Sequence, residues 1–168
     1  MKEKWDVLNK KRISTGEIME RGWLSPGQFH LIVNVWIKNK NDEFLISKRT
    51  SNKRWPNLWG CTVGSAISGD DSLKTALKET FEELGIKLNI ENGKLIESYI
   101  NYVNDKKDCG EFIDVWMFEQ DVDIDNIIFQ KDETCDAMWA TRKEIKQSME
   151  NGTFIPDKDL PYFDDSII

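Results

Sequence analysis

The stretch GSAISGDDSLKTALKETFEELGI, residues 64–86, decides the fold of this chain. Its second half has the apolar spacing of an amphipathic helix, which we expect over residues 72–84. Asp71 or Ser72 can cap the amino end of that helix, and Gly85 is placed to end it. One broad arc of the helix is predicted to face the core, and it is formed by Leu73, Ala76, Leu77, Thr80, Phe81 and Leu84.

Three glutamates crowd the other side of this helix. Glu79, Glu82 and Glu83 are predicted to point away from the core, where they repel one another and oppose the helix dipole. Judged alone, they are most simply read as a solvated acidic face. However, the loop before the helix, residues 64–69, has two glycines and small residues, so its backbone can approach a ligand closely. Loop and glutamates together could hold a hard cation such as Mg²⁺, which binds carboxylate and phosphate oxygens.

The segments around this stretch alternate between strand and helix patterns. A helix is also expected at residues 141–152, where Thr141 and Glu144 have the spacing of a capping box. The segment before residue 29 is predicted to hold a short strand and then a loop. The other expected strands are FHLIVNVWIK (29–38), its hairpin partner EFLISKR (43–49), GCTVG (60–64), KLIESYINYV (94–103), FIDVWMFE (112–119) and AMWA (137–140). This interleaving predicts a layered α/β domain with a mixed sheet.

Composition limits the functions that the chain can have. The 168 residues carry a net charge of −7, which disfavours binding to a nucleic-acid backbone. The start of the sequence has no apolar segment of the signal-peptide type, and no apolar run could span a bilayer. Cys61, Cys109 and Cys135 are odd in number and far apart, which indicates reduced thiols in a cytoplasmic protein.

The spacing within residues 64–86 resembles the Nudix box, G-x5-E-x7-R-E-U-x-E-E-x-G-U, where U is bulky and aliphatic. The matching positions are Gly64, Glu79, Glu82, Glu83, Gly85 and Ile86. Asp70 stands in place of the first Glu, Lys78 in place of the Arg, and Thr80 in place of the aliphatic residue. The likeness extends over residues 29–150, and the N-terminal piece resembles an added strand of a subgroup near isopentenyl-diphosphate isomerases.

The resemblance implies a fold, a reaction and a set of boundaries. The fold would be the Nudix αβα sandwich, with a mixed β-sheet between helices. Residues 1–168 would form a single domain, with residues 1–28 as an N-terminal extension. The reaction would be attack of water on a phosphorus of a pyrophosphate bond in a nucleoside diphosphate derivative or a nucleoside triphosphate. A homodimer is open by analogy with the family alone.

Carried over residue by residue, the resemblance also implies a metal site. Glu79 and Glu83 would be the main ligands of Mg²⁺, with Mn²⁺ as the alternative, and Glu82 would be a further ligand. Gly64, Lys78 and Gly85 would support the site, although a Lys cannot make the forked contact of an Arg. The catalytic base would be a box glutamate, Glu82 or Glu83, or a glutamate of a later loop. Glu133 is the best later candidate, as base and as ligand.

Two other functions stay open at this point. An isomerase of the prenyl-diphosphate type would need a Cys before the first box glycine and a His after it, where this chain has Val63 and Ser65. Cys61 lies two residues away and is predicted to share the face of Val63. A non-catalytic nucleotide-binding Nudix module is the second alternative. Trp55 and Trp59 could stack on a base, and His30, the single histidine, is expected in the core or facing a substrate.

Overall fold

The computed structural model describes residues 2–156, 160 and 163 of the chain. Its elements are, in chain order, β1 (Lys4–Leu8), β2 (Ser14–Glu20), β3 (Phe29–Lys38), β4 (Glu43–Arg49), β5 (Trp59–Gly60), β6 (Thr62–Ser65), α1 (Ser72–Leu84), β7 (Gly93–Tyr102), β8 (Gly110–Glu119), β9 (Thr134–Thr141) and α2 (Arg142–Glu150), with short 3-10 helices at Ile90–Asn92 and Ile124–Asn126. Both expected helices are therefore confirmed, and so are the strands expected after residue 28, except that the strand expected at residues 60–64 is divided into β5 and β6. No helix in this described part is long and apolar enough to cross a membrane.

Strand β3 is the centre of the sheet. It pairs in parallel with β8 along its whole length, from Phe29 opposite Gly110 to Lys38 opposite Glu119. It pairs with β6 in the antiparallel sense, and β7 lies antiparallel on the outer side of β8. Covered on both faces, β3 reads as an almost continuous apolar run, as expected for a strand of this kind.

The expected hairpin of β3 and β4 opens immediately after its turn. The two strands pair only at Lys38 and Phe44, after which β4 pairs with β9 and β5 instead. The space between the diverging strands is filled by an aromatic core that includes Trp36, Phe44 and Phe154. The two strands of the expected hairpin therefore belong to two different parts of the sheet, which are joined at the turn between Lys38 and Phe44.

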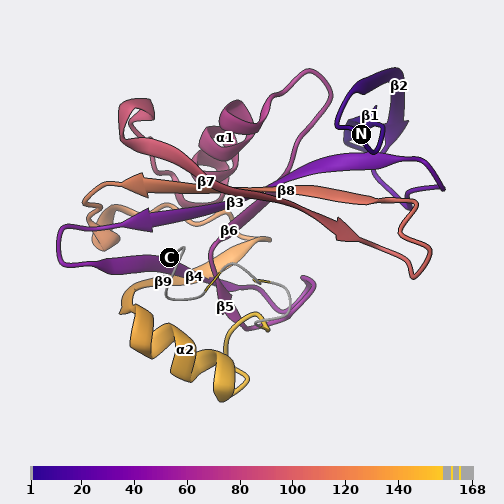
Figure 1. Ribbon diagram of the computed structural model, residues 1–168. Coiled ribbons are helices and arrows are strands. Elements are labelled where there is room, and N and C mark those ends of the chain that lie inside the picture. Colours follow the sequence, from indigo (N-terminus) through magenta and orange to yellow (C-terminus); the bar gives the residue numbers. More distant parts are fainter. Residues whose placement is uncertain (1, 157–159, 161–162, 164–168) are drawn as a thin grey trace.

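The helices lie on opposite sides of this arrangement (Figure 1). Helix α1 packs on the face of the sheet that presents Val33 and Val35, where Ala76 is fully buried. Helix α2 packs on the other side, where Ile145 is fully buried in the aromatic core. The mixed sheet between two helical layers confirms the expected αβα sandwich.

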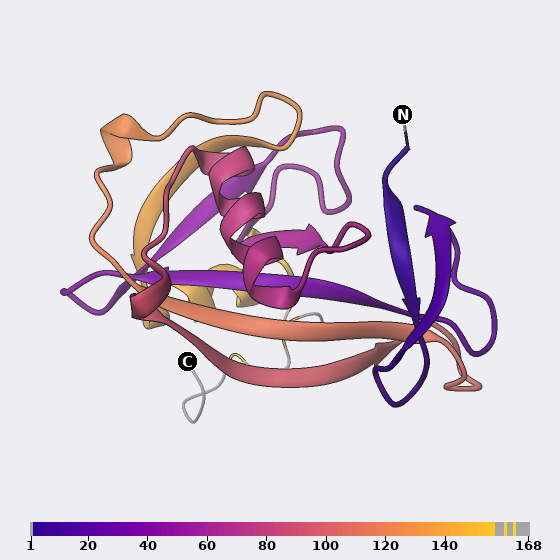
Figure 2. The same cartoon turned by 90° about the horizontal axis from the view of Figure 1, so that it is seen from above.

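The N-terminal segment differs from the expected single strand followed by a loop. It forms a hairpin of β1 and β2, which joins the sheet where Leu8 lies opposite Phe29. Figure 2 shows this hairpin beside the loop that leads into α1. Asp6 accepts hydrogen bonds from Ser68 Oγ at 2.6 Å and from the Gly69 backbone N–H at 2.8 Å. The hairpin therefore anchors the glycine-containing loop of residues 64–69.

Candidate active site

Helix α1 begins and ends where its capping residues predict. The Asp71 side chain accepts a hydrogen bond from the Lys74 backbone N–H at 2.8 Å. At the other end Gly85 has φ 69°, a left-handed conformation, and its N–H donates to the Phe81 carbonyl at 2.8 Å. A Cβ on Gly85 would also lie 3.0 Å from Ile128 Cβ, so both conformation and space favour glycine there. These caps fix which side chains of the helix face the sheet.

Glu83 is buried, in contrast to the solvated position that the helical periodicity predicts. Its residue is only 6% exposed, whereas Phe81, expected in the core, is 49% exposed. Burial raises the pKa of Glu83 to about 8, with further contributions from the charges of Glu79 and Glu133. The Glu83 side chain makes a hydrogen bond with Thr62 of β6, and the segment before β9 covers the same end of the helix, where the Gln130 N–H donates to the Glu83 carbonyl at 3.1 Å.

Glu79 lies flat against the backbone of β6. A Cβ on Gly64 would lie 2.0 Å from Glu79 Cγ, so only glycine leaves room for this side chain. Burial raises the pKa of Glu79 to about 7; Lys78 opposes this, and nearby carboxylates, Glu82 first among them, add to it. The glycine at position 64 thus allows a carboxylate to be held between helix and sheet.

Glu82 and Lys78 form the outer edge of the same helix. The Glu82 side chain is exposed, and Lys78 Nζ lies 4.0 Å from Glu82 Oε1, one helical turn away. An exposed pair at this separation contributes little free energy. Lys78 accordingly lies beside a box carboxylate, as the resemblance implies. Asp70 lies at the start of the helix, where its carboxylate is 2.6 Å from Lys74 Nζ.

Glu133 reaches the box from a distant part of the chain. It belongs to the loop before β9, and it pairs with Lys53 of the loop after β4. The neighbouring Thr134 Oγ donates to the Glu83 carbonyl at 2.9 Å, which ties this loop to the helix. The charge of Glu133 raises the pKa of both Glu79 and Glu83. The fold therefore brings Glu79, Glu83 and Glu133 within electrostatic reach of one another.

These carboxylates suit a hard cation in kind. Within the described residues, no three His, Cys, Asp or Glu side chains are gathered closely enough to coordinate an ion as they stand. Glu79 and Glu83 have raised pKa values chiefly because they are buried, and the charges of neighbouring carboxylates, Glu133 among them, add repulsion to this effect. A cation between them would relieve it. Carboxylate oxygens are the ligands that Mg²⁺ and Mn²⁺ prefer, so the donor set fits such an ion.

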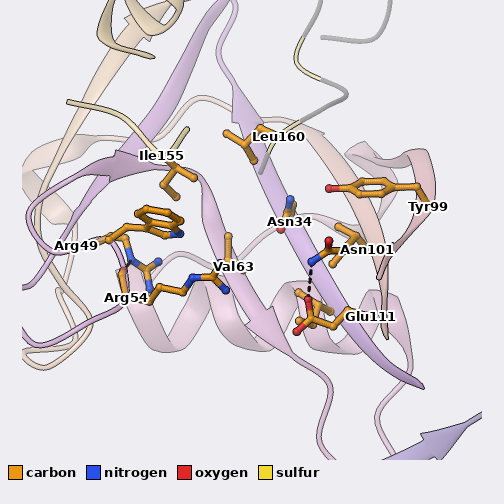
Figure 3. A pocket seen from close by; sticks show the side chains of 12 residues that line it. Asn34, Arg49, Arg54, Val63, Tyr99, Asn101, Glu111, Ile155 and Leu160 are labelled. Carbon is orange, nitrogen blue, oxygen red and sulfur yellow. Dashed lines mark hydrogen bonds between the residues drawn. The ribbon is translucent and has the colours of Figure 1, made fainter. Parts of the chain in front are cut away.

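A pocket lies on the face of β3, β7 and β8 opposite α1. Its cavity volume is about 170 Å³. Figure 3 shows Arg49 and Arg54 on one side, Tyr99, Asn101 and Glu111 on the other, and Asn34 and Val63 between them. Arg49 also acts on the box, because its charge lowers the pKa of the buried Glu83. The pocket and the carboxylates are thus neighbours that share one arginine.

The sequence analysis missed the charged lining of this pocket. Trp55 lines it, as the stacking hypothesis allows, whereas Trp59 packs against the aromatic core and is absent from the lining. Glu111 could have been found from its alternation in phase with Ile113 and Val115, which places a carboxylate on a largely apolar face. His30 is buried in the core and stacks on Trp5 at a centroid distance of 3.9 Å.

The residues around Gly64 disfavour an isomerase of the prenyl-diphosphate type. Val63 lines the pocket where that chemistry needs a cysteine, and Ser65 stands in the place of its histidine. Cys61 does share the side of Val63, as predicted, but it is 3% exposed within the aromatic core. Its thiol therefore lies among apolar side chains and away from a substrate's path.

The fold and the glutamate-bearing helix define a class of protein, the hydrolases of phosphate anhydrides that share the αβα sandwich. The NUDIX domain family model matches residues 28–158. The chain belongs to the Nudix family, and it is a Nudix pyrophosphohydrolase. It is 37% identical to the uncharacterised Nudix hydrolase lmo0368 of Listeria monocytogenes over 92% of this chain and 89% of the relative. It is 30% identical to Nudix hydrolase 3 of Arabidopsis thaliana, over 92% of this chain and 21% of that longer protein.

Solved structures have the same fold. The crystal structure of DR0079 from Deinococcus radiodurans aligns with a TM-score of 0.74 at 18% identity, over 95% of this chain and 96% of that one. The NUDIX domain of NrtR from Shewanella oneidensis, in complex with ADP ribose, aligns with a TM-score of 0.57 at 18% identity, over 74% of this chain and 79% of that one. At these identities the likeness establishes the fold alone.

Proposed function

We propose that this protein hydrolyses the pyrophosphate bond of a nucleoside diphosphate derivative or a nucleoside triphosphate, in a reaction that depends on Mg²⁺. The observation that carries the proposal is the set of Glu79, Glu83 and Glu133, buried or half-buried beside a pocket lined by two arginines. Mn²⁺ is the alternative ion, since it takes the same ligands. The ADP ribose bound by the NUDIX domain of NrtR supports a nucleotide-derived substrate.

Each residue would have a defined task. Glu79 and Glu83 would hold the ion, with Glu82 and Glu133 completing its ligands. A bound divalent cation neutralises charge on phosphoryl oxygens and lowers the pKa of a water ligand. Arg49, next to Glu83, would bind the phosphate oxygens as their charge grows in the transition state. Gly64 would keep Glu79 pressed against β6, and the Gly85 cap would keep Glu82 and Glu83 in register.

A carboxylate must also take the proton of the attacking water. Glu133 suits this task because it comes from a separate loop and can approach the substrate from the side opposite the helix. Its partner Lys53 would hold the side chain in place until substrate arrives. Glu82 or Glu83 is the alternative base. The two cases differ in rate: loss of the base lowers kcat, whereas loss of an ion ligand also raises the Mg²⁺ concentration needed for half activity.

The substitution Glu83→Gln tests the proposal. We expect kcat to fall by about 100-fold or more, because one buried ligand loses its charge while the shape is kept. The rise in melting temperature that Mg²⁺ produces in the wild type should shrink with it. Glu119→Gln, an exposed change at the end of β8, is the matched control and should behave as the wild type. Full activity in the Glu83→Gln variant would refute the metal assignment, whereas a wild-type protein that binds nucleotides without hydrolysing them would favour a non-catalytic binding module.

We also place the reaction in the cytoplasm, on small molecules and not on nucleic acid. The net charge of −7 and the free thiols of Cys109 and Cys135 support this placement.

Hydrolysis in oxygen-18 water, followed by identification of the labelled product, would reveal which phosphorus is attacked. Transfer of the label to a phosphate product is expected, and isomerised prenyl diphosphate without label would support the isomerase alternative.

A further inference from the structure

We propose that the pocket beside the carboxylates is a base-recognition site that selects guanine, with Glu111 and Asn101 as the specificity-determining residues. This inference rests on the proposed function, because it names the substrate class of the same site. It covers guanine derivatives that keep the two adjacent N–H donor groups of the guanine edge.

The pocket is sized for one flat group. At about 170 Å³ it is smaller than the roughly 300–1,000 Å³ of pockets that enclose whole drug-sized ligands. Its floor is mostly apolar, with Ile32, Val63 and Ile113 contributed by three adjacent strands, and it also holds the amide of Asn34. A planar ring suits an apolar floor of this size, whereas a sugar with several hydroxyls does not.

One wall is cationic and aromatic. Trp55 has φ 58°, a backbone conformation that non-glycine residues adopt rarely and that marks a position held by its surroundings. The Arg54 guanidinium lies 5.2 Å from the centroid of the Trp55 ring, and the Arg49 Nε donates to the Arg54 carbonyl at 2.8 Å. A base can stack against such a wall, as bases do on aromatic rings and guanidinium planes.

The opposite wall offers hydrogen-bond acceptors. The Asn101 Nδ2 donates to Glu111 Oε2 at 3.0 Å, and this bond sets the amide so that its Oδ1 is the acceptor end (Figure 3). Glu111 and Asn101 lie directly opposite one another in the antiparallel pair of β8 and β7, so the register fixes their separation. Burial raises the pKa of Glu111, and the hydrogen bond from Asn101 and the charge of Arg54, across the pocket, act in the opposite direction. An ionised carboxylate beside an amide oxygen presents acceptors only.

This acceptor wall matches the Watson–Crick edge of guanine. That edge carries an N1–H and an exocyclic N2–H₂ side by side, so a carboxylate can accept from both and the Asn101 oxygen from the remaining hydrogen. Adenine and cytosine place a ring-nitrogen acceptor beside their amino group, and uracil flanks its N–H with two carbonyls. Each of those edges would bring an acceptor against an acceptor, and the unpaired contact would lower the affinity for those bases.

The two ends of the pocket set the direction of the substrate. Arg49 acts on Glu83, so the phosphates would lie at the arginine end, next to the box. Arg54 lies on the same wall as Arg49, and its charge acts across the pocket on Glu111. A guanine nucleotide with its base on Glu111 therefore extends its phosphates toward Glu79, Glu83 and Glu133.

Rates on GTP, inosine triphosphate, ATP, CTP and UTP test the inference. We expect kcat/KM for GTP to exceed that for ATP by about 10- to 100-fold, the range of a good paired contact to one base. Inosine triphosphate keeps the N1–H and lacks the amino group, so it should lie between them. In the Glu111→Gln variant the GTP preference should fall to near unity, mainly through a higher KM. Glu119→Gln, on the same strand, is the matched control.

Binding of GMP and AMP without metal, measured by calorimetry, separates this inference from the proposed function. Tighter binding of GMP that Glu111→Gln abolishes supports the site even if no hydrolysis is found. Hydrolysis of pyrophosphate bonds without a guanine preference overturns the site and leaves the proposed function standing. A change in the ratio of GTP to dGTP, and not in the base preference, would assign Glu111 to the ribose and overturn the inference.

Discussion

His30 is the single histidine of the chain, and its ring lies flat on Trp5 beneath the N-terminal hairpin. In the described part of the chain, neither ring nitrogen makes a hydrogen bond, although the Asp6 backbone lies near enough to favour the charged form weakly. Burial outweighs this effect and lowers the pKa of His30 to about 4. The side chain is thus a neutral core ring at physiological pH, as one of the two sequence hypotheses states.

The lowered pKa of His30 predicts a pH dependence of stability. Between about pH 6.5 and pH 4 the unfolded chain binds a proton at this side chain and the folded chain does not, so acidification favours unfolding. The free energy of unfolding should fall by up to about 3 kcal/mol across this window, at about 1.4 kcal/mol per pKa unit. Urea denaturation of wild type and His30→Phe at several pH values measures the effect.

Phe is the informative replacement at this position because it keeps the stacked ring and cannot titrate. The variant should match or exceed the wild type in stability at pH 5, and the two should converge above pH 7. Parallel pH profiles for the two proteins would mean that His30 is not the group that titrates.

Helix α1 shows which properties of a helix can be predicted from the neighbouring residues in the sequence. Its bounds at Ser72 and Leu84 were predictable because caps and apolar periodicity are properties of adjacent residues. The burial of Glu83 was not predictable, since a helical wheel assumes one wall. This helix has two: the sheet packs against Ala76, and the segment of residues 122–129 packs in the cluster that holds Leu84.

The N-cap of α1 should contribute to the stability of the protein and not to its catalytic rate. Asp71→Ala removes the acceptor for the Lys74 N–H, and we expect a loss of about 1 kcal/mol in the free energy of unfolding. Asp71→Ser should retain most of the stability, because a serine hydroxyl also caps. Thermal denaturation measures both variants. Because the cap lies at the opposite end from Glu82 and Glu83, kcat should change less than threefold; equal losses in the Ser and Ala variants would exclude capping as the cause.

At the scale of the whole molecule, the N-terminal hairpin is more than an appendage. The family match begins at residue 28, yet Asp6 holds the loop of residues 64–69 and Arg12 reaches the core. The Arg12 guanidinium pairs with Asp114, a fully buried carboxylate that also accepts from Ser98 Oγ at 2.7 Å. These contacts hold the pKa of Asp114 below its usual range, against the opposing effect of burial.

Deletion of residues 2–28 should therefore prevent cooperative folding. It would leave the Asp114 charge buried without its partner, which costs about 3–5 kcal/mol, and it would also uncover His30 and Phe29. Urea denaturation followed by tryptophan fluorescence measures the transition. Asp6→Ala in the full chain is the milder variant: it should fold, with a lower kcat from the loosened loop. A truncated protein with wild-type activity would show that the hairpin is dispensable.

The pocket is the part of the molecule that the sequence could not reveal. Arg49 ends β4 and Arg54 belongs to the loop after it, while Asn101 and Glu111 come from two strands in the second half of the chain. No local pattern links these segments, since their meeting depends on the divergence of β4 from β3 after Lys38. Glu133 was found by resemblance and not by periodicity, for the same reason. The residues of the Nudix box could be predicted from the sequence because they all lie within one helix and the loop before it.

The parallel pairing of β3 with β8 has a consequence for synthesis on the ribosome. Phe29 is translated early, but its partner strand starts at Gly110, so the central strand emerges long before its neighbour exists. Until then an apolar strand with unpaired backbone groups is exposed, and contacts so distant in sequence form slowly. The antiparallel partner β6 is made much sooner. In a nascent chain, one edge of β3 can thus pair early with β6, while the other edge stays unpaired until β8 has been synthesised.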